Sequence, residues 1–212
     1  MMSHGLTFNN NSDVVTLDSE FARLVVIHKG IYGPAGGDFP SVITSQEPPL
    51  IFVRPSTGGF QWVSLKGSPG NWTGFINGAS GGSGSFFVAA YESAPTAKYG
   101  LRLWDGDAKQ LFDNGTPCAQ FTDVVAGWAY GGASNPSVGR WISTFYAAVP
   151  LNTGNYMLIN NIAMNIPGGS TFSLLSCFWD YANNRVVAQL QNIGDFNGSS
   201  FFLPLMFAKP IS

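Results

Sequence analysis

Charged side chains are scarce in this sequence. Lys, Arg, Asp and Glu make up 10% of the 212 residues, against roughly 25% in a typical soluble domain. A monomer with so few charges would cover much of its surface with small polar and apolar groups. Such surfaces usually pack against another subunit, because interface cores are poor in charge and rich in aromatic rings. The 17 Phe, 7 Tyr and 6 Trp residues agree with this, so the composition predicts a subunit of an assembly.

Other absences narrow the function classes. The net charge is −2 and the basic residues are scattered, whereas nucleic-acid binding needs a basic stripe. No apolar run reaches the roughly 18 residues of a membrane-spanning helix. The first residues lack the charged and apolar regions of a signal peptide. We therefore expect synthesis in the cytosol, no membrane insertion and no nucleic-acid partner.

Residues that serve catalysis or metal binding are also few. Cys118 and Cys177 are the two cysteines and form no CxxC pair, which predicts buried free thiols rather than a disulfide framework. His4 and His28 are the two histidines, and nothing in the sequence pairs either one with the orienting acid that a catalytic triad requires. We expect no enzyme activity, no cofactor and no metal site.

Two short motif matches have simpler interpretations. Residues 78–82 fit the pattern G-x-S-x-G, but no helix-forming sequence follows, as a nucleophile elbow would need. Asp105-Gly106-Asp107 with Asp113 resembles part of a calcium loop, yet Lys109 stands where a third acid is expected and no Glu closes the segment. The sequence therefore favours a Gly/Ser loop and a turn.

The apolar runs are short, rich in β-branched and aromatic residues, and separated by Gly and Pro. This pattern predicts an all-β protein with a sandwich or barrel architecture. The expected strands are 23–27, 50–53, 60–63, 86–89, 124–126, 141–146, 156–159, 171–175, 185–190 and 201–207.

Two segments 95 positions apart share one pattern. Gly5, Leu6 and Asp18 recur as Gly100, Leu101 and Asp113, with matching apolar positions between them. Each segment predicts a hairpin, and the trailing Asp is placed to cap the next turn. The repeat predicts two β-sandwich-like halves related by internal duplication. The N-terminal β domain would span 1–94 and the C-terminal β domain 95–212, because Ser93 to Lys98 reads as a linker.

Aromatic residues beside polar turns could stack on sugar rings. The candidates are Trp62, Trp72, Trp128, Tyr130 and Trp141, although most rings in β proteins belong to the core. Trp72 and Trp128 adjoin Gly/Asn/Ser turns and are expected to be the most exposed. Together with Tyr130 they form the predicted binding site, and the two Gly-rich segments 77–85 and 131–136 are expected to be loops.

The repeated hairpin also resembles the opening segment of small virion proteins from tailed bacteriophages. The residues that show this resemblance are Tyr99-Gly100-Leu101-Arg102-Leu103-Trp104-Asp105 through Leu111-Phe112-Asp113, and Gly5-Leu6 through Leu17-Asp18. The first copy has His4 in place of the Tyr, and the second has Asn114 where Ser is common. The resemblance implies a structural protein of the tail tip or tail fibre, located in the virion, without a cofactor or catalytic set. By analogy it implies a homotrimer that contacts other tail proteins.

Two other functions remain open. One is a lectin-like module that binds a host-surface glycan or protein receptor through Trp72, Trp128 and the Gly-rich loops. The other is a polysaccharide-cleaving enzyme, because distance along a sequence does not measure the separation of two carboxylates in space.

Overall fold

The computed structural model describes residues 7–9, 15–18, 24–78, 82–91, 97–149, 151, 154–163, 165–168, 171–193 and 200–211. The strands are β1 (Thr7–Asn9), β2 (Val15–Asp18), β3 (Val25–Tyr32), β4 (Gly36–Ile43), β5 (Leu50–Thr57), β6 (Gly59–Gln61), β7 (Ser64–Ser68), β8 (Asn71–Ile76), β9 (Ser83–Ala90), β10 (Arg102–Trp104), β11 (Gln110–Asp113), β12 (Cys118–Val125), β13 (Ala129–Ser137), β14 (Arg140–Ala148), β15 (Tyr156–Leu158), β16 (Asn165–Gly168), β17 (Thr171–Asp180), β18 (Arg185–Ile193) and β19 (Leu205–Ile211). Two short 3-10 helices, η2 (Asn160–Ala163) and η3 (Tyr181–Asn183), complete the described elements. The predicted all-β class is confirmed.

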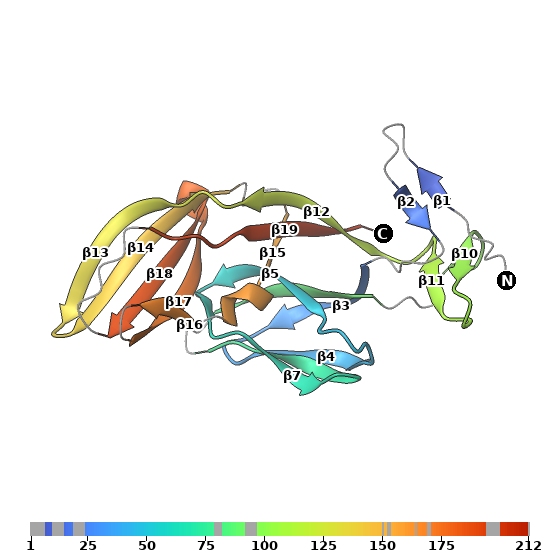
Figure 1. Ribbon diagram of the computed structural model, residues 1–212, viewed down its shortest axis with the longest axis horizontal. Helices are drawn as coiled ribbons and strands as arrows, with labels where there is room; N and C mark the ends of the chain where they lie inside the picture. The colour runs from blue at the N-terminus through green and yellow to red at the C-terminus, as the bar shows by residue number, and fades with distance from the viewer. Residues whose placement is uncertain are drawn as a thin grey trace.

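Six of these strands close into an antiparallel barrel in the order β12-β19-β15-β5-β9-β3. The barrel occupies the middle of the molecule (Figure 1). The sheet β13-β14-β18-β17-β16 lies at one end, and the hairpins β1-β2 and β10-β11 lie at the other. Closure is narrow at one seam, because the ladder between β12 and β3 consists of the single pair Cys118 and Val25.

The central barrel strands β5 and β9 are buried on both faces over 51–53 and 86–90, which explains their continuous apolar runs. Phe52 and Phe87 stack with ring centroids 4.7 Å apart and belong to the cluster inside the barrel. Their neighbours Ile51 and Phe86 belong instead to the larger core outside it. A strand buried on one face would alternate apolar and polar residues, whereas one buried on both faces needs apolar residues throughout.

In each half of the chain the barrel strands pack against a second sheet. Phe75 of β8 lies edge-on to Phe86 of β9, with ring centroids 5.4 Å apart, and thereby joins the sheet β4-β8-β7 to the barrel. In the second half, the rings of Trp179 on β17 and Phe207 on β19 lie 6.3 Å apart. Each half is therefore sandwich-like, with one layer supplied by the shared barrel.

The two predicted hairpins form and have the same register. Phe8 pairs with Leu17, and Leu103 pairs with Phe112. Both hairpins also carry a register shift at the following residue, before Asn9 in the first and before Trp104 in the second. The repeat seen in the sequence thus corresponds to a repeated local structure.

The correspondence extends into the barrel. Its strands follow the order β3-β9-β5 in the first half and β12-β19-β15 in the second, and the flanking sheets repeat β4-β8-β7 as β14-β18-β17. The ladder of β3 shifts register between Val26 and His28, and that of β12 shifts between Phe121 and Asp123. The internal duplication itself stays a prediction, but the shared strand order and bulge positions support it.

The predicted boundary between 94 and 95 falls between β9 and β10. It separates the two corresponding sets of strands, yet both the barrel and the main hydrophobic core run across it. We therefore describe the two parts as halves that share one core.

The prediction of a loop at 131–136 is wrong, because these residues lie within β13, the edge strand of its sheet. Register shifts between Tyr130 and Gly132 and between Ser134 and Ser137 interrupt its pairing with β14. An edge strand tolerates Pro and Gly at such bulges, because one side of its ladder is unpaired. In the segment 77–85, β9 already begins at Ser83, and residues 79–81 lie outside the described part of the chain.

Candidate functional site

The expected exposure of Trp72 is wrong. Its side chain is 7% exposed on β8, which lies between β4 and β7. The indole N–H donates a hydrogen bond to the Ser45 carbonyl oxygen over 3.0 Å. Because both the ring and its polar group are used inside the protein, Trp72 is a core residue rather than part of a surface site.

The other two predicted binding residues, Trp128 and Tyr130, pack against two phenylalanine rings that contact each other. Trp128 lies edge-on to Phe201 at 4.9 Å, and its indole N–H donates to the Leu203 carbonyl oxygen over 2.8 Å. Tyr130 packs on Phe145 at 5.5 Å, and Phe145 contacts Phe201. Trp128 is half-buried and Tyr130 is 42% exposed, so this pair is a partly exposed extension of the core.

Trp62 is more exposed than these residues, at 55%. It also has a left-handed backbone with φ of 51°, which residues other than Gly, Asn and Asp seldom adopt. Trp62 lies between β6 and β7, and nothing in the sequence distinguishes it from an aromatic residue of the core.

The structure brings no catalytic or metal-binding group together among the described residues. The Nε2 atom of His28 lies 3.0 Å from the Ser41 carbonyl oxygen, so a backbone group rather than a carboxylate faces it. Asp105 accepts hydrogen bonds from the backbone N–H groups of Asp107 and Lys109, as the predicted turn requires. No cluster of three metal-ligating side chains occurs in the described ranges; His4 lies outside them.

Both cysteines are free thiols, and Cys177 is buried as predicted, whereas Cys118 is only partly buried. Burial raises the pKa of Cys177 to about 12, which keeps this thiol protonated at neutral pH. None of the helices in the described part of the chain has the length and apolar character needed to span a bilayer.

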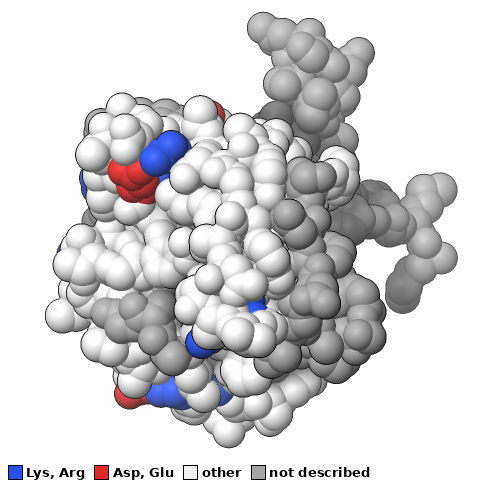
Figure 2. Space-filling view, turned by 90° about the vertical axis from the view of Figure 1, so that its left-hand side faces the viewer, with Lys and Arg blue, Asp and Glu red and all other residues white. Residues whose placement is uncertain are grey.

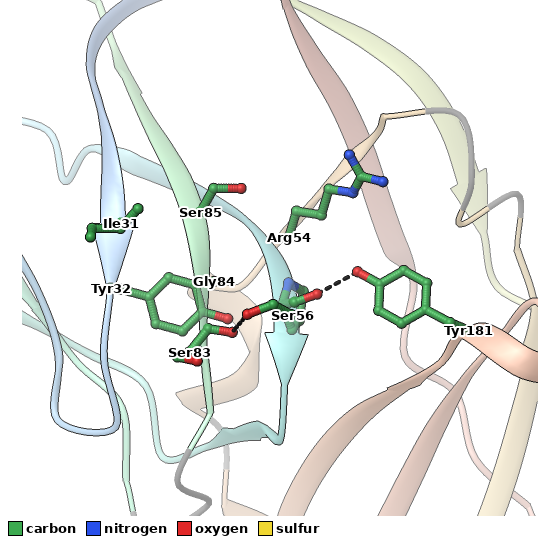
Figure 3. Close-up of a pocket in the computed structure, with 9 residues that line it drawn as sticks. Ile31, Tyr32, Arg54, Ser56, Ser83, Gly84, Ser85 and Tyr181 are labelled. Atoms are coloured by element: carbon green, nitrogen blue, oxygen red, sulfur yellow. Dashed lines mark hydrogen bonds between the residues drawn. The ribbon is translucent and has the colours of Figure 1, made fainter.

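A cavity lies beside the barrel, between β3, β5, β9 and η3. Its volume is about 560 Å³, within the range of roughly 300–1,000 Å³ typical of small-molecule sites. Ile31 and Tyr32 come from β3, Arg54 from β5 and Ser85 from β9, while Tyr181 reaches the cavity from η3 in the second half (Figure 3).

Hydroxyl groups line much of this cavity. Ser56 donates to the Ser83 carbonyl oxygen over 3.0 Å, and the Ser83 hydroxyl lies 2.9 Å from that of Thr57. Ser85 donates to the Tyr156 hydroxyl over 3.2 Å. These bonds hold the serine side chains in place, and each hydroxyl oxygen retains acceptor capacity.

Arg54 supplies the cavity's positive charge. Its side chain is half-buried and forms no ion pair with a described carboxylate. Burial raises the pKa of Tyr181, and the Arg54 guanidinium offsets part of that increase through a hydrogen bond and its charge. Tyr181 is therefore a neutral phenol, and its hydroxyl donates to the Pro55 carbonyl oxygen.

Tyr32 closes one wall of the cavity. Its ring is 4% exposed and packs against Phe60 and Phe75, with centroids 5.4 and 5.9 Å away. Its hydroxyl is buried without a hydrogen-bond partner in the described structure, and burial raises its pKa above the ordinary value of 10.0. The sequence analysis did not identify Arg54, Tyr32 or Tyr181 as site residues. The one available signal was for Arg54, a charged residue that directly follows the apolar run 50–53.

Comparisons with known proteins do not identify a relative. No protein-family model, no curated protein and no solved structure matches this chain.

Proposed function

We propose that this chain is a structural subunit of a bacteriophage tail tip or tail fibre, which packs against copies of itself and other tail proteins and contributes to host attachment. The observation that carries the proposal is the combination of few charges with large apolar side chains exposed on a folded β protein. The virion proteins that the repeated hairpin resembles have this structural role.

The end of the molecule formed by β13 and β14 is the surface proposed for assembly. Val138, in the turn between these strands, is fully exposed, and Tyr130 is 42% exposed. Figure 2 shows that charged side chains appear on this face in only a few separate places. An exposed apolar surface with so little charge loses little on burial, because few ions must be stripped of water.

Sedimentation velocity of the full chain over a range of concentrations tests the assembly. We expect self-association, with a homotrimer as the predicted state, and Val138→Glu is expected to weaken it because it buries a charge at the contact. Val138→Thr, which changes the same exposed position without adding charge, is the matched control. A wild-type chain that stays monomeric at high concentration would contradict self-association.

Electron microscopy tests the location. An antibody against the chain should label the distal end of tails on particles from the source culture. Labelling absent from tails, with the chain found free of particles, would refute the tail-tip assignment.

A second candidate is a surface-binding, lectin-like module, and the cavity at Arg54 favours it. That cavity combines a cation, several hydroxyl groups and an apolar wall, which are the groups that bind sugars. It replaces the predicted site at Trp72, whose ring is buried.

A further inference from the structure

We propose that the cavity between β3, β5, β9 and η3 binds the carboxylate of an acidic sugar, with Arg54 as the group that recognises it. This inference rests on the surface-binding candidate and names its ligand class. It does not depend on assembly into a tail.

Arg54 is placed for an anionic ligand. It lies half-buried at the cavity and no described carboxylate lies within ion-pair distance of it. A guanidinium presents parallel N–H groups that match a carboxylate, and such charge-assisted pairs are stronger than neutral hydrogen bonds. One of the 10 basic residues of the chain lies here, in a position that no described carboxylate neutralises.

The lining favours a single negative charge and disfavours a cationic group. Arg54 is the one cationic residue among the lining residues, and no Asp or Glu lines the cavity. A phosphate carries close to two negative charges at neutral pH and usually meets several donors, which this wall does not provide. A free amino acid would also bring an ammonium group, for which the lining residues supply no carboxylate partner.

The remaining wall suits a polyhydroxylated ring. The hydroxyl oxygens of Ser56, Ser83 and Ser85 are held by internal hydrogen bonds and retain lone pairs for ligand hydroxyl donors. Ile31, which is 85% exposed, adds an apolar surface at the rim. An acidic sugar offers the three matching features: a carboxylate, hydroxyl donors and C–H faces.

The corresponding positions of the second half lack this site. The barrel ladders place Phe86 of β9 in correspondence with Leu205 of β19, so Ser85 corresponds to Pro204. Likewise Arg54 corresponds to Asn160, whose side chain accepts from Ile51 N–H over 2.7 Å and donates to the Pro49 carbonyl oxygen over 2.9 Å. The barrel therefore does not require a cation at this position.

A matched pair of probes tests the inference: methyl β-glucuronide and methyl β-glucoside, which differ in having a carboxylate or a hydroxymethyl group. Both are titrated into the full-length chain while the amide NMR signals of Gly84 and Ser85 are followed. We expect the glucuronide to shift these signals with an affinity at least tenfold higher than that of the glucoside.

Variants assign the effect to the guanidinium. Arg54→Gln should weaken glucuronide binding at least tenfold, and Arg54→Lys should fall between it and wild type because it keeps the charge but loses the planar fork. Lys29→Gln, which removes one exposed charge from the same strand as Ile31 without touching the cavity, should change affinity less than twofold. Unchanged amide spectra away from the cavity verify that each variant is folded.

Three results with the sugar probes would overturn the inference. They are an absence of glucuronide shifts at the highest soluble concentration, equal binding of the neutral glucoside, and full affinity in Arg54→Gln. Inorganic phosphate that binds more tightly than the glucuronide would also overturn it, in favour of a general oxyanion site. None of these results bears on tail assembly, which sedimentation and microscopy test separately.

Discussion

The hydroxyl of Tyr181 donates a hydrogen bond to the backbone carbonyl of Pro55. This contact joins η3, which follows β17 in the second half, to β5 of the barrel in the first. It also sets the position of the phenol ring at the mouth of the Arg54 cavity. One hydrogen bond thus couples the shape of the candidate site to the packing of the two halves.

Tyr181→Phe removes this hydrogen bond and keeps the ring. We expect a loss of about 1 kcal/mol in the free energy of unfolding, the usual net value of one hydrogen bond, measured by urea denaturation. Tyr91→Phe, which alters an exposed phenol, is the control and should leave stability unchanged. Equal stability of Tyr181→Phe and wild type would show that the bond contributes nothing.

Tyr32→Phe should act in the opposite direction. The Tyr32 hydroxyl is buried without a described partner, so its removal should stabilise the protein by about 1 kcal/mol, the low end of the cost of an unsatisfied buried group. A rise in the urea midpoint with an unchanged denaturant slope would verify this. A loss of stability would mean that the hydroxyl has a partner after all.

Tyr32 also predicts how stability depends on pH. Burial raises its pKa in the folded state above the ordinary 10.0, so the unfolded chain releases this proton first. Stability is therefore complete below about pH 10 and falls at higher pH, by up to about 1.4 kcal/mol per pH unit for this group. Urea denaturation between neutral pH and pH 11 should show this fall in wild type and a shallower one in Tyr32→Phe. Identical slopes would exclude Tyr32 as the cause.

Gly84 allows β9 and β5 to approach at the cavity. A Cβ atom there would lie 2.3 Å from the Arg54 carbonyl oxygen and 2.8 Å from Cα of Pro55. Gly84→Ala must push the strands apart, and we expect a loss of about 2 kcal/mol, typical of overpacking, together with a lower melting temperature. Gly106→Ala is the matched control, because nothing lies within 4 Å of its added Cβ. A Gly84→Ala protein as stable as the control would contradict this close approach.

Asp113 holds the second hairpin together. Its buried carboxylate pairs with Arg102 over 2.7 Å and accepts the backbone N–H groups of Ala97 and Gly115 over 3.0 and 2.9 Å. Asp113→Asn leaves the partly exposed guanidinium without its charge partner, and we expect about 2 kcal/mol of local destabilisation, typical of the loss of a hydrogen bond to a charged group. Faster amide hydrogen exchange confined to β10 and β11 is the expected readout. Asp107→Asn, at an exposed turn position, should leave exchange unchanged, and equal exchange in both variants would contradict the role of Asp113.

The sequence predicted best where local pattern decides the structure. Alternating apolar residues around a polar turn predicted both hairpins, and the trailing Asp113 caps the turn at Gly115 as expected. Short apolar runs such as 50–53 and 86–89 predicted strands that now lie in the barrel. In these segments, the intrinsic secondary-structure preference of each residue agrees with the strand in which the folded protein places it.

The sequence failed where a distant strand decides the environment. Trp72 adjoins a Gly/Asn turn, but β4 pairs with its strand and the Ser45 carbonyl, 27 positions away, accepts its indole N–H. Residues 131–136 have a loop composition, yet pairing with β14 makes them an edge strand. The Arg54 cavity depends on Tyr181 in the other half of the chain, and no local pattern brings these two residues together.

The closed barrel has one further consequence. Its two seams join corresponding strands, β3 with β12 and β5 with β15. Either half alone would be a three-stranded sheet with two unpaired edge strands, and these edges match the edges of a second such sheet. The covalent connection between β9 and β10 therefore holds the two halves together at any protein concentration, although only the first half contains Arg54.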